Sequence, residues 1–140
     1  MFANSTEIPF ALFGLYEGWA KARGIATVDS SYVTLEFEVK DILIGIIRSK
    51  TKEICLPLKE IESIQLINRW WQGHPRIEIK AKSLKAFSKV PDHRGKQITL
   101  YVSAKDIASA EKWVMTAQSL VFDTQMLLTK AHLRILENSD

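Results

Sequence analysis

The sequence predicts an α+β fold in which a seven-stranded, antiparallel, bent-sheet barrel is capped by a C-terminal amphipathic helix. From residue 20 to residue 103, β-branched and aromatic residues alternate with polar residues in short runs that are separated by turn residues. After Ser103 the apolar residues recur every three to four positions, which is the period of a helix. A chain of 140 residues with 46% hydrophobic residues can build one packed core, so we interpret residues 1–140 as a single domain.

The strands are predicted from this alternation and from the turns between them. Residues 32–39 are the clearest case, because their apolar side chains occupy every second position and would share one face of a sheet. Turns are expected at residues 29–31, 49–52 and 72–75, and residues 58–64 have the spacing of one helical turn. The seven predicted strands are residues 22–28, 32–39, 42–47, 53–58, a longer run through Trp71, 76–82 and 96–103.

One amphipathic helix is predicted after the strands, with Ser103 as a suitable N-cap. Residues 104–122 are expected to cap the barrel. Residues 123–140 are expected to form a helical extension, which either continues the capping helix or begins a second helix near Asp123 and Thr124. The apolar face of the capping helix consists of Ile107, Ala110, Val114, Ala117 and Val121.

Residues 1–19 form an apolar N-terminal segment that contains Phe10 and Phe13. Such a segment is too apolar for a free tail, so we expect it to pack on its own barrel in preference to a neighbouring subunit. It lacks a basic n-region, and no apolar run approaches the length that a membrane span requires. Because Cys55 is the single cysteine, the chain suits a reducing compartment, and we expect a cytoplasmic protein.

Residues 54–64, with the sequence ICLPLKEIESI, and Trp113 in the predicted helix carry a resemblance to a known family. The stretch is similar to the I-x-L-x-x-I-x-x-I segment of bacterial pleckstrin-homology-like and GRAM-type domains. Seven antiparallel strands followed by one helix is also the element order of that superfold, which the chain resembles over roughly residues 20–122. The resemblance implies a helix-capped barrel into which Trp113 packs. It does not imply the family's phosphoinositide site, because the first hairpin, residues 28–32, is short and acidic here.

No constellation in the sequence indicates catalysis. His74, His93 and His132 lie in different elements without metal-ligand spacing, and Cys55 is interpreted as a buried, inert thiol. The sequence has no nucleophile elbow, P-loop or dinucleotide fingerprint. We therefore expect no enzyme activity, no cofactor and no metal.

The most one-sided charge lies in residues 76–96, where basic residues outnumber acidic ones. We favour the interpretation that this region is a solvated face on an edge strand, whose lysines prevent pairing with other sheets. The alternative is peripheral attachment to an anionic membrane, with Phe87 inserting among the lysines; a nucleic-acid partner is not expected. The candidate anionic-partner surface is Lys80, Lys82, Lys85, Phe87, Lys89, Arg94 and Lys96.

The leading functional hypothesis is a non-catalytic binding or scaffold module that engages a protein partner or a second copy of itself. It is motivated by the surplus of apolar residues at both termini. Residues 122–136 need something to cover their apolar side, so they either fold back or form a dimer. A small-ligand carrier or an enzyme is a minor alternative, which a polar pocket around His74 or His93 would favour. The candidate protein interface is Phe10, Phe13, Trp71, Met126, Leu133 and Leu136.

Overall fold

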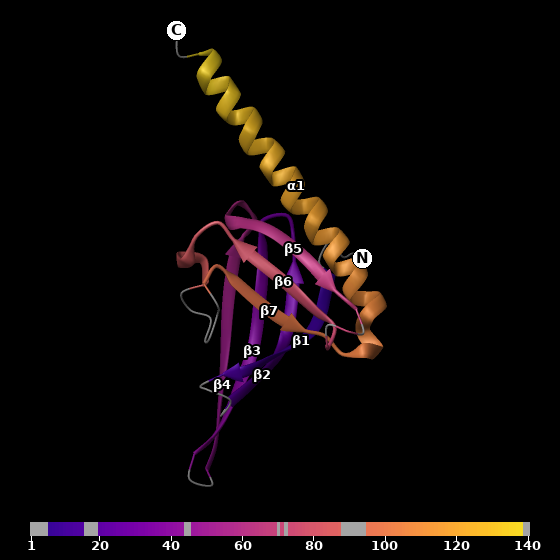
Figure 1. Cartoon of the computed structure of the whole chain (residues 1–140). Coiled ribbons are helices and arrows are strands. Elements are labelled where there is room, and N and C mark those ends of the chain that lie inside the picture. Colours follow the sequence, from indigo (N-terminus) through magenta and orange to yellow (C-terminus); the bar gives the residue numbers. More distant parts are fainter. Residues whose placement is uncertain are drawn as a thin grey trace.

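The computed structural model describes residues 6–15, 20–43, 46–69, 71, 73–87 and 95–138. They form an α+β fold in which seven antiparallel strands make one sheet and a long helix follows it (Figure 1). The strands are β1 (Thr6–Leu15), β2 (Ala20–Val28), β3 (Tyr32–Leu43), β4 (Ile46–Pro57), β5 (Ile61–Ile67), β6 (Arg76–Ala81) and β7 (Gln97–Tyr101). The helix is α1 (Ile107–Glu137), and three short 3₁₀ turns are η1 (Leu58–Glu60), η3 (Leu84–Phe87) and η4 (Ala104–Asp106).

Over the described residues the sheet does not close on itself, so the seven antiparallel strands are confirmed but the predicted barrel is not. Its strand order is β4-β3-β2-β1-β7-β6-β5, which leaves β4 and β5 as its edges. The sheet has two halves, β1–β4 and β5–β7, which among the described residues are joined where Ala11 of β1 pairs with Tyr101 of β7. In Figure 1 the strands β5–β7 cross in front of β1–β4. Closing the sheet into a barrel would pair the two edge strands, β4 and β5. Here the outer edge of β5 is covered by α1, whose polar side chains donate hydrogen bonds to carbonyls of β5.

A long hairpin of two strands, β3 and β4, replaces three of the predicted strands, residues 32–39, 42–47 and 53–58. The pairing runs without interruption from Tyr32 opposite Pro57 to Leu43 opposite Ile46. Residues 49–52, predicted as a turn, therefore lie inside β4. The prediction was wrong because a run of serine, threonine and lysine is also typical of an edge strand, where lysine discourages pairing with other sheets.

The apolar N-terminal segment supplies the strand that the prediction omitted. β1 pairs with β2 along most of its length, and it contributes Ile8, Phe10 and Leu12 to the core. The rings of Phe10 and Phe37 meet edge to face, with centroids 6.4 Å apart, which is a favourable aromatic geometry. This confirms that the segment packs on its own sheet. The predicted total of seven strands was correct, although β1 was not predicted as a strand and three predicted strands are two in the structure.

The predicted local structures near η1 and the first hairpin are confirmed. The carboxylate of Asp29 accepts the backbone N–H groups of Ser31 and Tyr32 at 2.7 and 2.9 Å, which fixes the turn between β2 and β3. η1 forms one helical turn directly after β4. Its Leu58 is buried and its backbone N–H donates to the carbonyl of Ser31, so the turn is attached to the same hairpin.

Candidate functional site

The helix α1 is the most unusual element, because one half packs on the sheet and the other half projects beyond it (Figure 1). It has 31 residues and is therefore about 46 Å long. It contains no glycine or proline and runs through Asp123 and Thr124 without a break. Of the two alternatives for residues 123–140, the structure shows the continuous helix up to Glu137.

The packed half inserts its small and apolar residues into the core. Trp113 is fully buried, and its indole N–H donates to the carbonyl of Ala26 in β2 at 3.1 Å. This satisfies the polar atom of a large buried side chain, as burial requires. The other buried residues of α1 are Ala110, Val114, Ala117 and Val121, which the sequence predicted as the apolar face.

Two glutamines of α1 attach the helix to the edge strand β5. Gln118 donates to the carbonyl of Ile64 at 2.7 Å, and Gln125 donates to the carbonyl of Ile61 at 3.5 Å. The side chain of Lys82, just after β6, donates to the amide oxygen of Gln125 at 3.1 Å. These contacts mark the point at which α1 leaves the sheet. Neither glutamine was predicted as a contact from the sequence, although their spacing of seven residues places them on one side of a helix.

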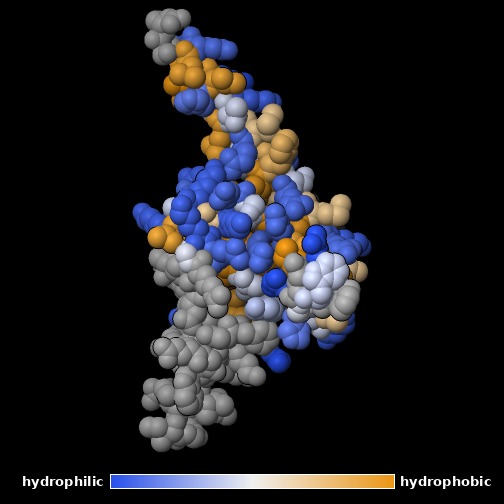
Figure 2. Space-filling view, in the orientation of Figure 1, coloured by the Kyte–Doolittle hydropathy of each residue, from blue (hydrophilic) through white to orange (hydrophobic). Residues whose placement is uncertain are grey.

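The projecting half, residues 126–137 of α1, carries many exposed apolar side chains. All residues from Met126 to Asn138 are exposed. Figure 2 shows orange, apolar atoms on this part of the helix, above a front face of the sheet that is mainly blue. Large contiguous apolar surfaces of this kind mark interaction sites. The exposed large apolar residues of the projecting half and of the turn before it are Phe122, Met126, Leu127, Leu128, Leu133, Ile135 and Leu136.

The structure divides the predicted protein interface into separate parts. Met126, Leu133 and Leu136 lie together on the projecting half of α1 and are exposed. Phe10 is only 4% exposed, so it is a core residue and is not available to a partner. The side chain of Phe13 lies outside the described residues.

Trp71, the remaining candidate of this interface, lies far from the projecting half of α1. Because Gln125 bonds near the start of β5 and Gln118 further along it, the strand runs toward the N-terminal half of the helix. Trp71 follows β5 and is 62% exposed, and the guanidinium of Arg69 lies 5.8 Å from the centre of its ring. This distance allows a cation–π contact. Trp71 is therefore not part of the surface formed by Met126, Leu133 and Leu136.

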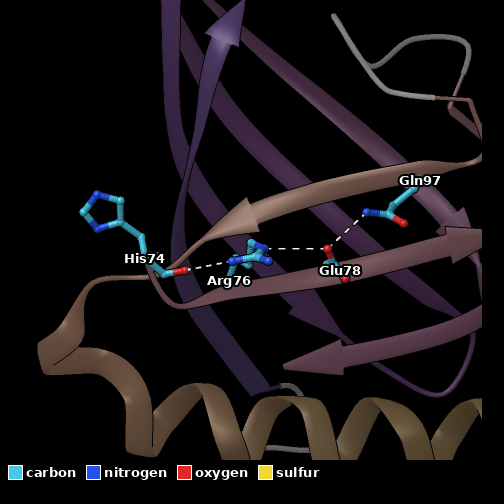
Figure 3. A network of polar contacts seen from close by, with 4 residues as sticks. All are labelled: His74, Arg76, Glu78 and Gln97. Atoms are coloured by element: carbon cyan, nitrogen blue, oxygen red, sulfur yellow. Dashed lines mark hydrogen bonds and ion pairs between the residues drawn. The ribbon is translucent and has the colours of Figure 1, made fainter. Parts of the chain in front are cut away.

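The basic region is partly neutralised and is not on an edge strand. β6 pairs with β5 on one side and β7 on the other, so the edge-strand interpretation was wrong. Figure 3 shows Arg76 between the carbonyl of His74 and the carboxylate of Glu78, which also accepts a hydrogen bond from Gln97. The Arg76 and Glu78 side chains are 3.6 Å apart and about four-fifths buried, so this pair removes one positive charge from the surface.

The remaining members of the candidate anionic-partner surface have different positions. Lys80, Lys82, Lys85 and Lys96 are exposed, whereas Lys89 and Arg94 lie outside the described residues. Phe87, the last residue of η3, is fully buried and therefore cannot insert into a bilayer in this conformation. Attachment to an anionic membrane stays a prediction, without its inserting aromatic side chain.

The described cysteine and histidine side chains lie on separate elements. Cys55 is exposed, not buried as predicted, because it alternates with the buried Ile54 and Leu56 and so points to the other face of β4. His132 is exposed on α1, and His93 lies outside the described residues. Among the described side chains, no group of three potential metal ligands comes together.

A groove of about 510 Å³ lies where β1 and β7 diverge, next to η4. Its accessible carbon-rich surface includes Pro9 and Tyr101, and the basic residues Arg23 and Lys105 lie beside His74 in its lining. The volume is within the range of small-molecule sites. His74 was predicted from the sequence as a marker of such a pocket, whereas Arg23 and Lys105, which come from elements distant in sequence, were not predicted. The remaining lining residues are Phe10, Ala11, Val102, Ser103 and Asp106.

Comparison of the chain with protein-family models, curated proteins and solved structures finds no match in any of the three. Among the described helices, none combines the length and the apolar character needed to cross a membrane.

Proposed function

We propose that this chain is a non-catalytic binding module with a pleckstrin-homology-like arrangement, and that it engages a protein partner through the projecting half of α1. The resemblance is supported by the element order and by Trp113, which packs from the helix into the sheet. A barrel-like shape of the sheet is also part of this proposal, and it is supported by the crossing of the two sheet halves around a shared core.

The observation that carries the proposed function is the exposure of the apolar half of α1. A single helix without tertiary contacts is only marginally stable in water, since packing of an apolar face supplies most helical stability. Residues such as Leu127, 68% exposed, and Ile135, 66% exposed, have no such packing within the described chain. A protein surface that covers them would remove this apolar area from water and stabilise the helix.

Site-specific photocrosslinking in living cells tests the proposal. A photoreactive phenylalanine analogue at Phe122 or Met126 is expected to form a covalent adduct with a protein, which mass spectrometry then identifies. The matched control carries the same analogue at Glu36, an exposed position in the middle of β3. If adducts at Phe122 and Met126 are no more abundant than at Glu36, the proposed function is wrong.

The groove beside η4 favours a second candidate function, the binding of a small organic anion. Arg23 and Lys105 would attract the anionic group, while Pro9 and Tyr101 would contact an apolar body. The dye 8-anilinonaphthalene-1-sulfonate has this chemistry. Its fluorescence enhancement is expected to fall when Arg23→Gln and Lys105→Gln are combined, whereas Lys112→Gln on the exposed side of α1 leaves it unchanged. Equal fluorescence in both variants would remove this candidate.

A further inference from the structure

The exposed face of α1 carries a seven-residue repeat. Positions 115, 119, 122, 126, 129, 133 and 136 are separated alternately by four and three residues, which is the pattern that packs in coiled coils. Five of the seven residues are large and apolar, and all seven are exposed. This row, called the outer row below, consists of Met115, Ser119, Phe122, Met126, Thr129, Leu133 and Leu136.

The outer row lies on the side of α1 that is turned away from the sheet. With about 100° between successive residues, Met126 is roughly half a turn from Ala117, which is buried against the sheet. The row begins at Met115, on the part of the helix that is packed on the domain. A second helix could therefore lie along the whole row without meeting the sheet of the first copy.

Charged residues beside the outer row indicate how a second copy would lie. Asp123 and Lys130 follow Phe122 and Thr129 and occupy the same flank of the row. In an antiparallel pair, equivalent flanks of the two helices face each other. When Phe122 lies opposite Leu133 of the second copy, Asp123 comes beside Lys130 of the second copy, and symmetry repeats this opposite-charge contact.

Other arrangements lose this charge complementarity. An antiparallel shift by one heptad places Asp123 near Asp123 or Glu137 of the second copy, or Lys130 near Lys130, and like charges destabilise such contacts. A parallel pair places Asp123 and Lys130 beside Gln118 and Gln125, whose amides already bond to β5.

We propose that two copies of this chain pair through the outer row as an antiparallel coiled coil, with Phe122 opposite Leu133 and Asp123 beside Lys130 of the second copy. This inference rests on the proposed function of α1 as a protein-binding element, and it names the partner. The sheets of the two copies then lie at opposite ends of a shared helical rod.

Sedimentation equilibrium on the full chain tests the pairing. The expected mass is that of two 15.9 kDa chains, and Leu133→Lys is expected to weaken the dimer about a hundredfold, since it places a charge in the apolar seam. The matched control is Leu128→Lys, an exposed leucine on the other side of the projecting half, which should leave the dimer intact. A wild-type monomer at every attainable concentration, or equal loss in both variants, would overturn the pairing.

Charge exchange tests the register. Asp123→Lys and Lys130→Asp are each expected to weaken self-association about tenfold, because each turns two attractive contacts into repulsive ones. Mixing the two variants is expected to restore wild-type affinity in a heterodimer, where every facing pair again has opposite charge. Failure of the mixture to recover would show that these residues do not face each other.

Cysteine crosslinking tests the orientation in a Cys55→Ser background. Ser119→Cys mixed with Leu136→Cys is expected to give a disulfide-linked heterodimer on oxidation, whereas Ser119→Cys alone should give none. Efficient crosslinking of Ser119→Cys with itself would indicate a parallel pair and overturn the proposal. If the purified chain is monomeric but photocrosslinks to a different protein in cells, only this inference fails; if it does neither, the proposed function fails too.

Discussion

At the scale of single residues, Trp113 connects the C-terminal helix α1 to the strand β2. Its indole ring is buried in the core, and its N–H bonds to the carbonyl of Ala26, so one side chain attaches α1 to β2. Because the contact joins residues 87 positions apart, it forms only when the helix lies against β2. Docking of α1 therefore brings the largest buried side chain into the core.

Two replacements of Trp113 are expected to separate the contribution of its hydrogen bond to the free energy of unfolding from that of its packing. Trp113→Phe loses the hydrogen bond and leaves the Ala26 carbonyl buried, which we expect to lower the free energy of unfolding by about 1–3 kcal/mol. Trp113→Ala adds a large cavity and is expected to cost about 3–5 kcal/mol. Urea denaturation measures both, and equal losses in the two variants would show that the hydrogen bond dominates.

Gly24 is required because two strands approach closely at its position. A Cβ atom there would meet the carbonyl oxygen of Glu36 and would lie 2.6 Å from the Cβ of Phe37, closer than carbon atoms can approach. Gly24→Ala is therefore expected to destabilise the fold by roughly 1–3 kcal/mol, measured by urea denaturation. Ile25→Thr, at the adjacent half-exposed position, serves as control and should change stability by less than this.

At the scale of elements, the two edges of the sheet are protected in different ways. The β5 edge is covered by α1, with Gln118 and Gln125 donating to its carbonyls. The β4 edge has no such cover among the described residues, and its sequence instead contains Arg48, Lys50 and Lys52. Basic residues on an edge strand disfavour pairing with other sheets.

The double variant Gln118→Ala/Gln125→Ala tests the cover of β5. Loss of two hydrogen bonds is expected to lower the free energy of unfolding by about 1–3 kcal/mol and to speed amide exchange in β5 relative to β2. Glu111→Ala, at an exposed position of the same helix, controls for the change in helix propensity. Unchanged exchange in β5 would show that apolar packing alone holds the helix in place.

Local sequence patterns predicted the elements that they alone determine. The Asp29 turn, η1, the buried face of α1 and most strands follow from alternation, period and turn chemistry, and the structure has them. The pattern failed where tertiary context decides. Residues 49–52 look like a turn until their place on the edge of a long hairpin is known, and the exposure of Cys55 depends on which face of β4 meets the core.

The candidate site shows the same division. Met126, Leu133 and Leu136 were predicted because apolar residues beyond a capping helix need a partner, and the structure exposes them together. Phe87 was predicted as a surface residue because lysines surround it in sequence, but its side chain turns into the core. No local pattern could bring Arg23 and Lys105 to one groove, because only the sheet order places β2 and η4 near each other.

At the scale of the whole molecule, the protein consists of a compact sheet body and a helical rod that leaves it (Figure 1). The rod gives the single chain a larger radius of gyration than a compact domain of this size, for which about 14 Å is expected. Small-angle X-ray scattering on the monomeric Leu133→Lys variant should exceed this value, and a chain ending at Asp123 should approach it. A value near 14 Å for both would show that the helix folds back in solution.

The continuity of α1 has a thermodynamic consequence. The same unbroken helix supplies Trp113 to the core and Leu133 to the association surface, so a chain that unfolds also gives up its partner. Any species that binds the folded chain alone raises its stability in proportion to the logarithm of its concentration. With a second copy as the partner, the melting temperature of this protein would rise with its own abundance, and a cell that made too little of it would hold a less stable one.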